Sequence, residues 1–439
     1  MKKIFYLAII AIIVSACSHN NSVSTQRKGT PVAVVSIDDR TMVIDTNGTA
    51  LIGFNQNAPF NVVNKFSEGL AAVVNRESDL MGFVNIKGEL VIPCNYSWEY
   101  HYTELDGKCR ERYVFHDGYA RVGTLESPVF IDRQGNQLLE QYGVVDWNKE
   151  VAVVTNGKSY GLVDMTGREI IPVEGRGYSM LEFCGDNMLR YMKDDQYGYC
   201  DSKGILITGN DYIRAADFVD GYALVCRYVE NSEKYDVCVI DRKGKVYKKI
   251  DLESDDCFYG EMYCGDRTAT SFSEGLAIHS CYNKGKSVIH NGKYEVVAVI
   301  DYETSCPFHD GLAAVAAIKA NDKRDDYGFV NPKGELVIPC QFKPNSYGEY
   351  FAWSFNEGLC FASKDKEWIV IDKKGNRVGC LNGFKPVTNF VAGHACVKKG
   401  YDDYTFVDRF GKDILAKHMT QESIYYYSDN DNSERTTWF

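Results

Sequence analysis

Acidic turns are the most frequent feature of this chain that could support chemistry. Nine times an aspartate or asparagine stands three residues before a glycine, directly after a short apolar run, and these pairs are Asp45–Gly48, Asn85–Gly88, Asp132–Gly135, Asp164–Gly167, Asp201–Gly204, Asp241–Gly244, Asn331–Gly334, Asp372–Gly375 and Asp408–Gly411. Carboxylates on turns can bind Ca²⁺, but each turn offers one acid, and a calcium site takes roughly six to eight oxygen ligands. An aspartate or asparagine that opens a type I turn instead caps the amide two residues on. We therefore predict turn caps, with no metal and no other cofactor.

The catalytic motifs that we sought do not define an enzyme. His-Glu-x-x-His and P-loop signatures are both missing. His116 and His309 occupy the same position of two Phe-His-Asp-Gly segments, which predicts a tolerated surface position beside a turn. Paired carboxylates for glycoside hydrolysis would come from different strands, so the sequence alone does not identify them. No enzymatic activity is predicted.

The amino terminus predicts a signal peptide over residues 1–16, because a basic start precedes an apolar run over residues 4–14. Residues 14–17 are Val-Ser-Ala-Cys and resemble a bacterial lipobox. This resemblance implies cleavage before Cys17 and a lipid on its sulfur, followed by a flexible polar tether over residues 17–30. We expect a cell-envelope protein held in the outer membrane by this lipid, since no aspartate follows the cysteine. The periplasmic or surface face stays open, and an ordinary secreted protein is the alternative.

Charge and cysteine usage narrow the classes of partner. The net charge is −11 and no lysine or arginine cluster stands out, which argues against nucleic acid as a partner. Fifteen cysteines in an oxidising compartment permit disulfides. Cys226 with Cys238, which flank a polar loop, and Cys257 with Cys264 are the candidate pairs. The Cys-x-x-Cys spacing of a zinc site is missing from the sequence.

Aromatic residues give the strongest indication of a binding surface. The chain has thirty tyrosines and five tryptophans, and two insertions concentrate them. The candidate surface consists of Tyr96, Trp98, Tyr100, Tyr102, Tyr347, Tyr350 and Trp353. Tyrosine and tryptophan give a large contact area at a low entropic cost, so these residues could stack on a sugar ring or on a partner protein. The alternative is an added strand that packs one face, because aromatic residues at alternate positions also suit a strand.

The elements that position these residues are short strands in tandem copies. The first strand of a copy follows Phe-x-(Asp/Glu)-Gly, as at Phe66–Gly69. The second is the apolar run before the Asp/Asn-x-x-Gly turn, and the third follows that turn and is expected to stop at a proline, as in Glu169–Pro172. Most steps between turns are 32 to 47 residues, which marks a repeat array. The one long step, from Asp241 to Asn331, is expected to contain a degraded copy at Val299–Asp301.

Internal duplication is clearest between residues 82–96 and 328–342, which are identical at twelve of fifteen positions. The pattern Phe-Ser-Glu-Gly-Leu-Ala, then Tyr-Gly-Phe-Val-(Asp/Asn)-x-x-Gly, then Val-Ile-Pro resembles the WG repeat of bacterial proteins. The Trp-Gly of that family is here Tyr160-Gly161, Tyr197-Gly198, Tyr327-Gly328 or Met81-Gly82. The resemblance implies an interaction or envelope module and no reaction.

The predicted fold class is all-β, with about ten tandem antiparallel β-meander repeats in a propeller-like ring or an open curved array. The repeat domain is expected over residues 31–419, followed by a polar and aromatic tail over residues 420–439. The expected function is lipid-anchored binding of a protein or a glycan through loops of this scaffold. The alternatives are a glycan-active enzyme with acidic residues in a propeller channel and a purely structural envelope protein.

Overall fold

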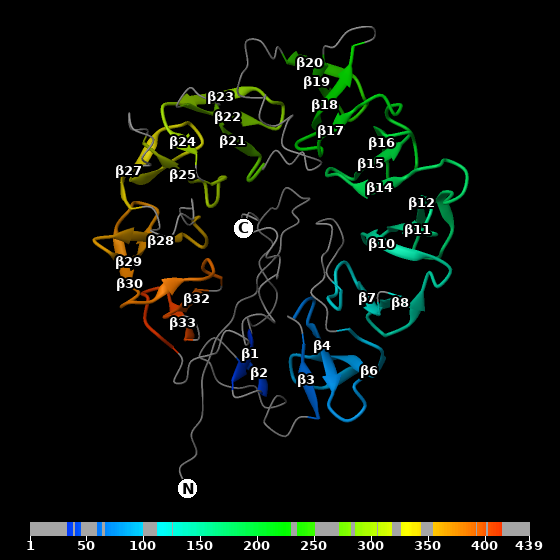
Figure 1. Cartoon of the computed structure of the whole chain (residues 1–439), viewed down its shortest axis with the longest axis horizontal. Coiled ribbons are helices and arrows are strands. Elements are labelled where there is room, and N and C mark those ends of the chain that lie inside the picture. Colours follow the sequence, from blue (N-terminus) through cyan, green and yellow to red (C-terminus); the bar gives the residue numbers. More distant parts are fainter. Residues whose placement is uncertain are drawn as a thin grey trace.

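The chain folds into a ring of small antiparallel sheets that follow one another in sequence order (Figure 1). The computed structural model describes residues 33–37, 40–44, 59–63, 66–99, 112–124, 126–229, 235–250, 272–281, 286–304, 306–317, 326–343, 354–391, 393–400 and 403–414. In these residues the regular elements are the strands β1 to β33, which form ten sheets. The prediction of an all-β array of about ten meander repeats is therefore confirmed. The described residues contain no helix that is long and apolar enough to cross a membrane.

The first five sheets are formed by consecutive strands. Their strands are β1 (Ala33–Ile37) and β2 (Arg40–Ile44); β3 (Phe60–Val62), β4 (Leu70–Asn75), β5 (Met81–Asn85) and β6 (Leu90–Tyr96); β7 (Tyr119–Gly123), β8 (Pro128–Asp132) and β9 (Gln137–Leu138); β10 (Gly143–Trp147), β11 (Val151–Thr155), β12 (Tyr160–Asp164) and β13 (Glu169–Ile171); and β14 (Met180–Phe183), β15 (Met188–Lys193) and β16 (Gln196–Asp201).

The last five sheets are built in the same way. Their strands are β17 (Arg214–Ala215), β18 (Tyr222–Tyr228), β19 (Tyr235–Asp241) and β20 (Val246–Ile250); β21 (Leu276–Cys281), β22 (Lys286–Asn291) and β23 (Val296–Ile300); β24 (Glu303–Thr304), β25 (Ala313–Ala316), β26 (Tyr327–Val330) and β27 (Leu336–Phe342); β28 (Leu359–Lys364), β29 (Glu367–Asp372) and β30 (Arg377–Cys380); and β31 (Lys385–Pro386), β32 (His394–Lys398) and β33 (Tyr404–Asp408).

The sheets are oriented like the blades of a propeller. In Figure 1 the early strand of a sheet lies toward the middle of the ring and the late strand toward its outside, as the labels β14 to β16 and β28 to β30 show. The red strand β33 lies near the blue strand β1. In the described residues no sheet combines strands from the two ends of the array. The described strands of the first and last repeats therefore do not share the sheet that would tie a ring shut.

The hydrophobic core is divided among the seams between neighbouring sheets. Phe83 and Ile92 of the β3–β6 sheet are buried together with Ala120 and Ile131 of the β7–β9 sheet. Similar clusters join successive sheets along the array. Sheets inside the array thus bury apolar faces against both neighbours, which confirms that the array is stabilised by stacking rather than by one central core.

The Asp/Asn-x-x-Gly turns form as the sequence predicts. Asn331 Oδ1 accepts hydrogen bonds from the amides of Lys333 and Glu335, each at 3.0 Å. The amide of Gly334 donates to the Asn331 carbonyl at 2.9 Å, with φ at 79° in the left-handed region. The same double cap recurs at Asn85, Asp132, Asp164, Asp201, Asp241, Asp372 and Asp408. The remaining predicted pair, Asp45–Gly48, lies outside the described residues.

The degraded copy lies elsewhere than predicted. Val299 and Ile300 belong to β23, the third strand of its sheet, so they do not precede a turn. The turn is at Asn291, whose Oδ1 accepts the amides of Lys293 and Glu295. Tyr294 takes the left-handed position with φ at 59°, where the other copies have glycine. The prediction failed because the pattern required a glycine there.

The third strands do not always stop at proline. β6 and β27 continue past Pro93 and Pro339, whereas β13 ends before Pro172. The register of β6 and β27 against the neighbouring strand shifts around Pro93 and Pro339. Each proline therefore lies in a bulge, where the ladder does not need the N–H that proline lacks. The prediction of a stop at proline is therefore wrong for the two best-preserved copies.

The pair Cys226 and Cys238 does not form a disulfide. Cys226 lies opposite Val237 and Cys238 lies opposite Val225 in the β18–β19 ladder. Because successive residues of a strand face opposite sides, the two thiols are buried in different seams and are free. The other candidate pair, Cys257 and Cys264, lies outside the described residues, as do Cys17, residues 1–30 and the tail over residues 420–439.

Candidate functional site

Each Phe-x-(Asp/Glu)-Gly segment forms a tight two-residue turn at the start of a repeat. Ser67 and Leu70 exchange backbone hydrogen bonds at 2.9 and 3.0 Å, and Glu68 and Gly69 between them have φ of 51° and 81°. Positive φ at both central residues defines a type I′ turn. The acidic residue has positive φ at Glu68, Asp117, Asp220, Glu274, Asp310 and Glu357. A left-handed residue other than glycine costs about 1 kcal/mol, so its recurrence indicates that the acid has a function.

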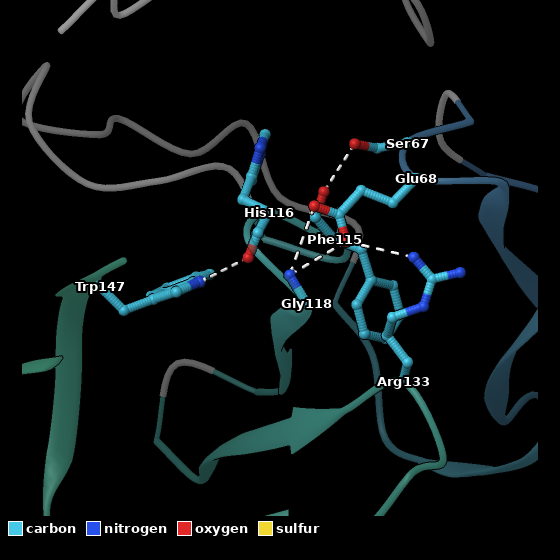
Figure 2. Close-up of polar contacts among 7 residues, drawn as sticks. All are labelled: Ser67, Glu68, Phe115, His116, Gly118, Arg133 and Trp147. Carbon is cyan, nitrogen blue, oxygen red and sulfur yellow. Dashed lines mark hydrogen bonds and ion pairs between the residues drawn. The ribbon is translucent and has the colours of Figure 1, made fainter. Parts of the chain in front are cut away.

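The acid links its repeat to the next one. Glu68 Oε2 accepts a hydrogen bond at 3.0 Å from the amide of Gly118, which is the glycine of the following turn (Figure 2). The same link is made from Glu274 to Gly311 at 2.8 Å, from Asp310 to Gly358 at 2.7 Å and from Glu357 to Gly393 at 2.6 Å. We call these contacts the acid–glycine links. In these links the carboxylates of Glu68, Glu274, Asp310 and Glu357 are used as hydrogen-bond acceptors for the scaffold, which weakens their candidacy as catalytic acids.

Further polar contacts join the same turns. Figure 2 shows Ser67 Oγ donating to the Phe115 carbonyl at 2.6 Å and Trp147 Nε1 donating to the His116 carbonyl at 2.8 Å. Arg133 lies 3.4 Å from Glu68 Oε2. His116 and His309 are half-buried rather than fully exposed, and burial lowers the pKa of His309. The prediction of a tolerated surface position is thus only partly met, because neither side chain is fully exposed.

Two residues of the predicted aromatic surface lie in the described part, and both contact the core. Tyr96 and Trp98 are half-buried against the cluster between the β3–β6 and β7–β9 sheets. Tyr96 Oη donates to the Gly135 carbonyl at 3.0 Å, and Trp98 Nε1 donates to Asp79 Oδ1 at 3.1 Å. Burial, with a smaller contribution from Asp132, raises the pKa of Tyr96. The other members, Tyr100, Tyr102, Tyr347, Tyr350 and Trp353, lie outside the described residues.

Both ends of the insertion that contains Tyr100 and Tyr102 are held by polar contacts. Glu99 is the last described residue before the insertion and Arg112 the first after it, and their charged groups lie 3.6 Å apart. Arg112 is buried, with its guanidinium 5.1 Å from the centroid of the Tyr113 ring. Tyr113 Oη donates to the Gly123 carbonyl at 2.8 Å. We call this arrangement the loop neck, and sequence reasoning did not identify it because Arg112 has no distinctive local pattern.

A second aromatic feature was missed by the sequence analysis. Tyr228 and Tyr235 pair across the end of the β18–β19 hairpin, with ring centroids 5.1 Å apart. Their exposed fractions are 58% and 41%. Behind them, Arg227 and Lys249 both contact Asp236, at 2.8 and 2.9 Å. This pair could have been predicted from the sequence, because two tyrosines flank a short polar segment there.

Two short segments that match the letters of catalytic motifs lie in hairpins. Residues 157–161 match the Gly-x-Ser-x-Gly letters of serine hydrolases, and residues 363–366 match Ser-x-x-Lys. The first lies at the turn between β11 and β12 and the second at the turn between β28 and β29. The nucleophile elbow requires a strand followed by a helix, which this context does not provide. Neither motif therefore supports a catalytic assignment.

A buried ion cluster lies between the β14–β16 and β17–β20 sheets. Arg190 contacts Glu182 and lies 3.0 Å from Asp217. Burial opposes the charged form of Arg190, but the carboxylates of Asp217 and Glu182 outweigh it and raise the pKa of this guanidinium. The buried guanidinium thus has a carboxylate partner in β14 and another just after β17. No group of three or more potential metal ligands occurs in the described part of the chain.

The chain is similar to several solved structures at low sequence identity. A search of curated proteins found no match to this chain. Among solved structures, a eukaryotic initiation factor is 8% identical with a TM-score of 0.42, and the match covers 81% of this chain and 98% of that chain. BamB from Moraxella catarrhalis is 11% identical with a TM-score of 0.27 (78% and 92% covered), and apo AztD from Citrobacter koseri is 12% identical with a TM-score of 0.30 (79% and 93% covered). At TM-scores below 0.5 these likenesses carry no functional argument.

The family model described as the WG containing repeat matches residues 81–104 and 327–368. These segments begin at β5 and β26, the second strands of the two copies that are most alike in sequence. The chain therefore carries WG-containing repeats.

Proposed function

We propose that this chain is a lipid-anchored envelope protein that binds a protein or a glycan through loops of its β-repeat ring. The observation that carries the proposal is the loop neck, where Glu99, Arg112 and Tyr113 hold both ends of an insertion with tyrosines at positions 100 and 102. Recognition residues are often placed on loops that a rigid scaffold positions. A fixed neck also reduces the ordering cost of binding, because the ends of the loop are already in place.

The acid–glycine links support a structural role rather than a catalytic one for the turns. Their carboxylates accept backbone amides of the next repeat, so they hold the scaffold in place. The lipid anchor on Cys17 belongs to this proposal and rests on the lipobox resemblance. It would place the ring at the membrane surface, with residues 17–30 as a tether.

The proposal is tested with a photo-crosslinking amino acid at Tyr102 and, as a control, at Glu150, an exposed position in the connection between β10 and β11. Intact cells are irradiated, and the purified chain is also applied to a glycan array. We expect crosslinked products, or glycan binding that Tyr100→Ala and Tyr102→Ala remove, with no products from position 150. Equal crosslinking from both positions together with a silent array would contradict loop-mediated binding.

A further inference from the structure

The outer strand β23 presents an apolar edge that no other strand of the described part of the chain pairs with. Val296, Val297 and Val299 have exposed fractions of 52%, 45% and 57%. β23 is hydrogen-bonded to β22 on one side, and it is the last strand of its sheet in the described structure. In Figure 1 it lies on the outside of the ring. Its outward side therefore offers backbone groups next to a strip of valines.

Other long outer strands of the described ring carry features that block strand addition. β6 and β27 contain Pro93 and Pro339 within a bulge. β20 has the same length as β23 but carries Lys248 and Lys249. Proline, bulges and lysines are the usual protection of an edge strand against pairing with another chain. β23, with the sequence Val-Val-Ala-Val-Ile, contains neither proline nor lysine. Its one bulge lies at its start, where the register shifts between Val296 and Ala298, and Ala298, Val299 and Ile300 pair with β22 in regular register.

Charges at both ends of β23 indicate which kind of chain could pair with it. Glu295 precedes the strand and is exposed, and Asp301 follows it with 83% of its side chain exposed. If two copies paired antiparallel through β23, Glu295 of one would approach Asp301 of the other, and like charges at facing positions are destabilising. A strand with a basic residue at each end would instead complement both acids. Lys286, 3.3 Å from Asp301, is a solvent-exposed contact that such a strand could displace.

We propose that the outer edge of β23 binds an extended polypeptide segment of a partner protein, which adds a strand to the sheet and carries lysine or arginine at each end. Backbone hydrogen bonds would supply affinity, and alternate apolar side chains would contact Val297 and Val299. This edge is separate from the loop neck, so the proposal does not depend on the loop-mediated function.

The probe is a fluorescent peptide with the sequence Lys-Val-Thr-Val-Thr-Val-Lys and blocked termini, titrated into the purified full chain and followed by anisotropy. We expect saturable binding that Val299→Lys weakens by about tenfold or more, because the added charge lies in the pairing edge. Val297→Lys is a second variant with the same expectation. The matched control is Val337→Lys on β27, a valine with an exposed fraction of 41% on an edge that proline already blocks, and it should bind the peptide as the wild type does.

Two further peptides test the mode of binding. N-methylation of alternate amides removes the donors that a β-ladder needs, and it should abolish binding. Replacement of both lysines by glutamate should weaken binding by about tenfold at low salt. Equal binding of the N-methylated peptide, or equal loss in Val337→Lys and Val299→Lys, would overturn the proposal. It would also be overturned if sedimentation showed a wild-type dimer that Val299→Lys dissociates, because the occupant would then be a second copy.

Discussion

The carboxylate of Glu274 accepts the amide of Gly311 at 2.8 Å, although the two residues belong to turns of neighbouring sheets. Both residues have positive φ, 55° and 74°. In the turn of Asp310 and Gly311, the carboxylate of Asp310 accepts a hydrogen bond from the next repeat. The amide of Gly311 in the same turn donates a hydrogen bond to the acid of the preceding repeat. One turn thus acts as both acceptor and donor along the array. In the last copy the acid is replaced by Ala392, while Gly393 still donates to Glu357.

Gly328 should be among the least replaceable residues of the chain. A Cβ at this position would lie 2.3 Å from the Ile338 carbonyl oxygen and 2.8 Å from the Cys340 nitrogen, both backbone atoms of β27. Gly328→Ala should therefore lower the free energy of unfolding by about 3 kcal/mol, measured by urea denaturation. Gly358→Ala is the control, because a Cβ there meets nothing within 4 Å and only the positive φ is penalised, at about 1 kcal/mol. Equal losses in the two variants would contradict the close approach of β27.

The turn cap at Asp164 predicts a dependence of stability on acid pH. Thr166 Oγ1 donates to this carboxylate at 2.6 Å, and this hydrogen bond, with those from Arg168, lowers the pKa of Asp164 from 3.8 to about 2. The folded-state pKa lies below the unfolded one, so the stabilisation is present above about pH 4 and is lost as pH falls toward 2. Asp164→Asn keeps the cap without the titration. The difference in urea midpoint between the two proteins should shrink over this pH range, and a constant difference would count against the prediction.

Much of the fold was predictable because it depends on local patterns. Asp or Asn three residues before glycine fixes a turn within five residues, so the apolar runs on either side had to be paired strands. The pattern failed at Asn291, since Tyr294 adopts a conformation that usually needs glycine while it packs against Phe272 and His290. The prediction that a strand stops at proline failed at Pro93, because the bulge that accommodates this proline depends on the missing Cβ of Gly82 on the neighbouring strand.

The candidate site was harder to predict because its contacts cross between repeats. Glu68 and Gly118 are fifty residues apart, and nothing in either segment indicates that they meet. The loop neck likewise depends on Arg112, an arginine within a polar stretch that becomes buried only when the two sheets pack. The concentration of aromatic residues identified Trp98 as a candidate binding residue. Its hydrogen bond to Asp79, nineteen residues earlier, forms only once the chain has folded.

Trp98→Ala should destabilise the chain by about 2 kcal/mol, because Trp98 packs against the core and donates to Asp79. Trp98→Phe should recover most of this loss, since it keeps the packing and removes only the hydrogen bond. Urea denaturation of both variants checks the expectation. An alanine variant as stable as the wild type would show that the indole does not contribute to the seam.

The lipid anchor is tested by Cys17→Ser. If Cys17 carries the lipid, the wild-type chain should partition into the detergent phase and the variant into the aqueous phase, because the acyl chains supply the membrane affinity. Cys94→Ser, at a half-buried position of the repeat, is the control and should partition like the wild type. A serine variant at position 17 that still enters the detergent phase would refute the anchor.

The central claim is that the acid–glycine links from Glu68, Glu274, Asp310 and Glu357 each join one repeat to the next independently, and hydrogen exchange of the glycine amides tests it most directly. In the wild-type chain the amides of Gly311, Gly358 and Gly393 should all exchange slowly. In Glu274→Ala the account predicts that protection is lost at Gly311 and retained at Gly358 and Gly393, whose acceptors are Asp310 and Glu357. Fast exchange of all three amides in the wild type, or unchanged protection of Gly311 in the variant, would contradict it.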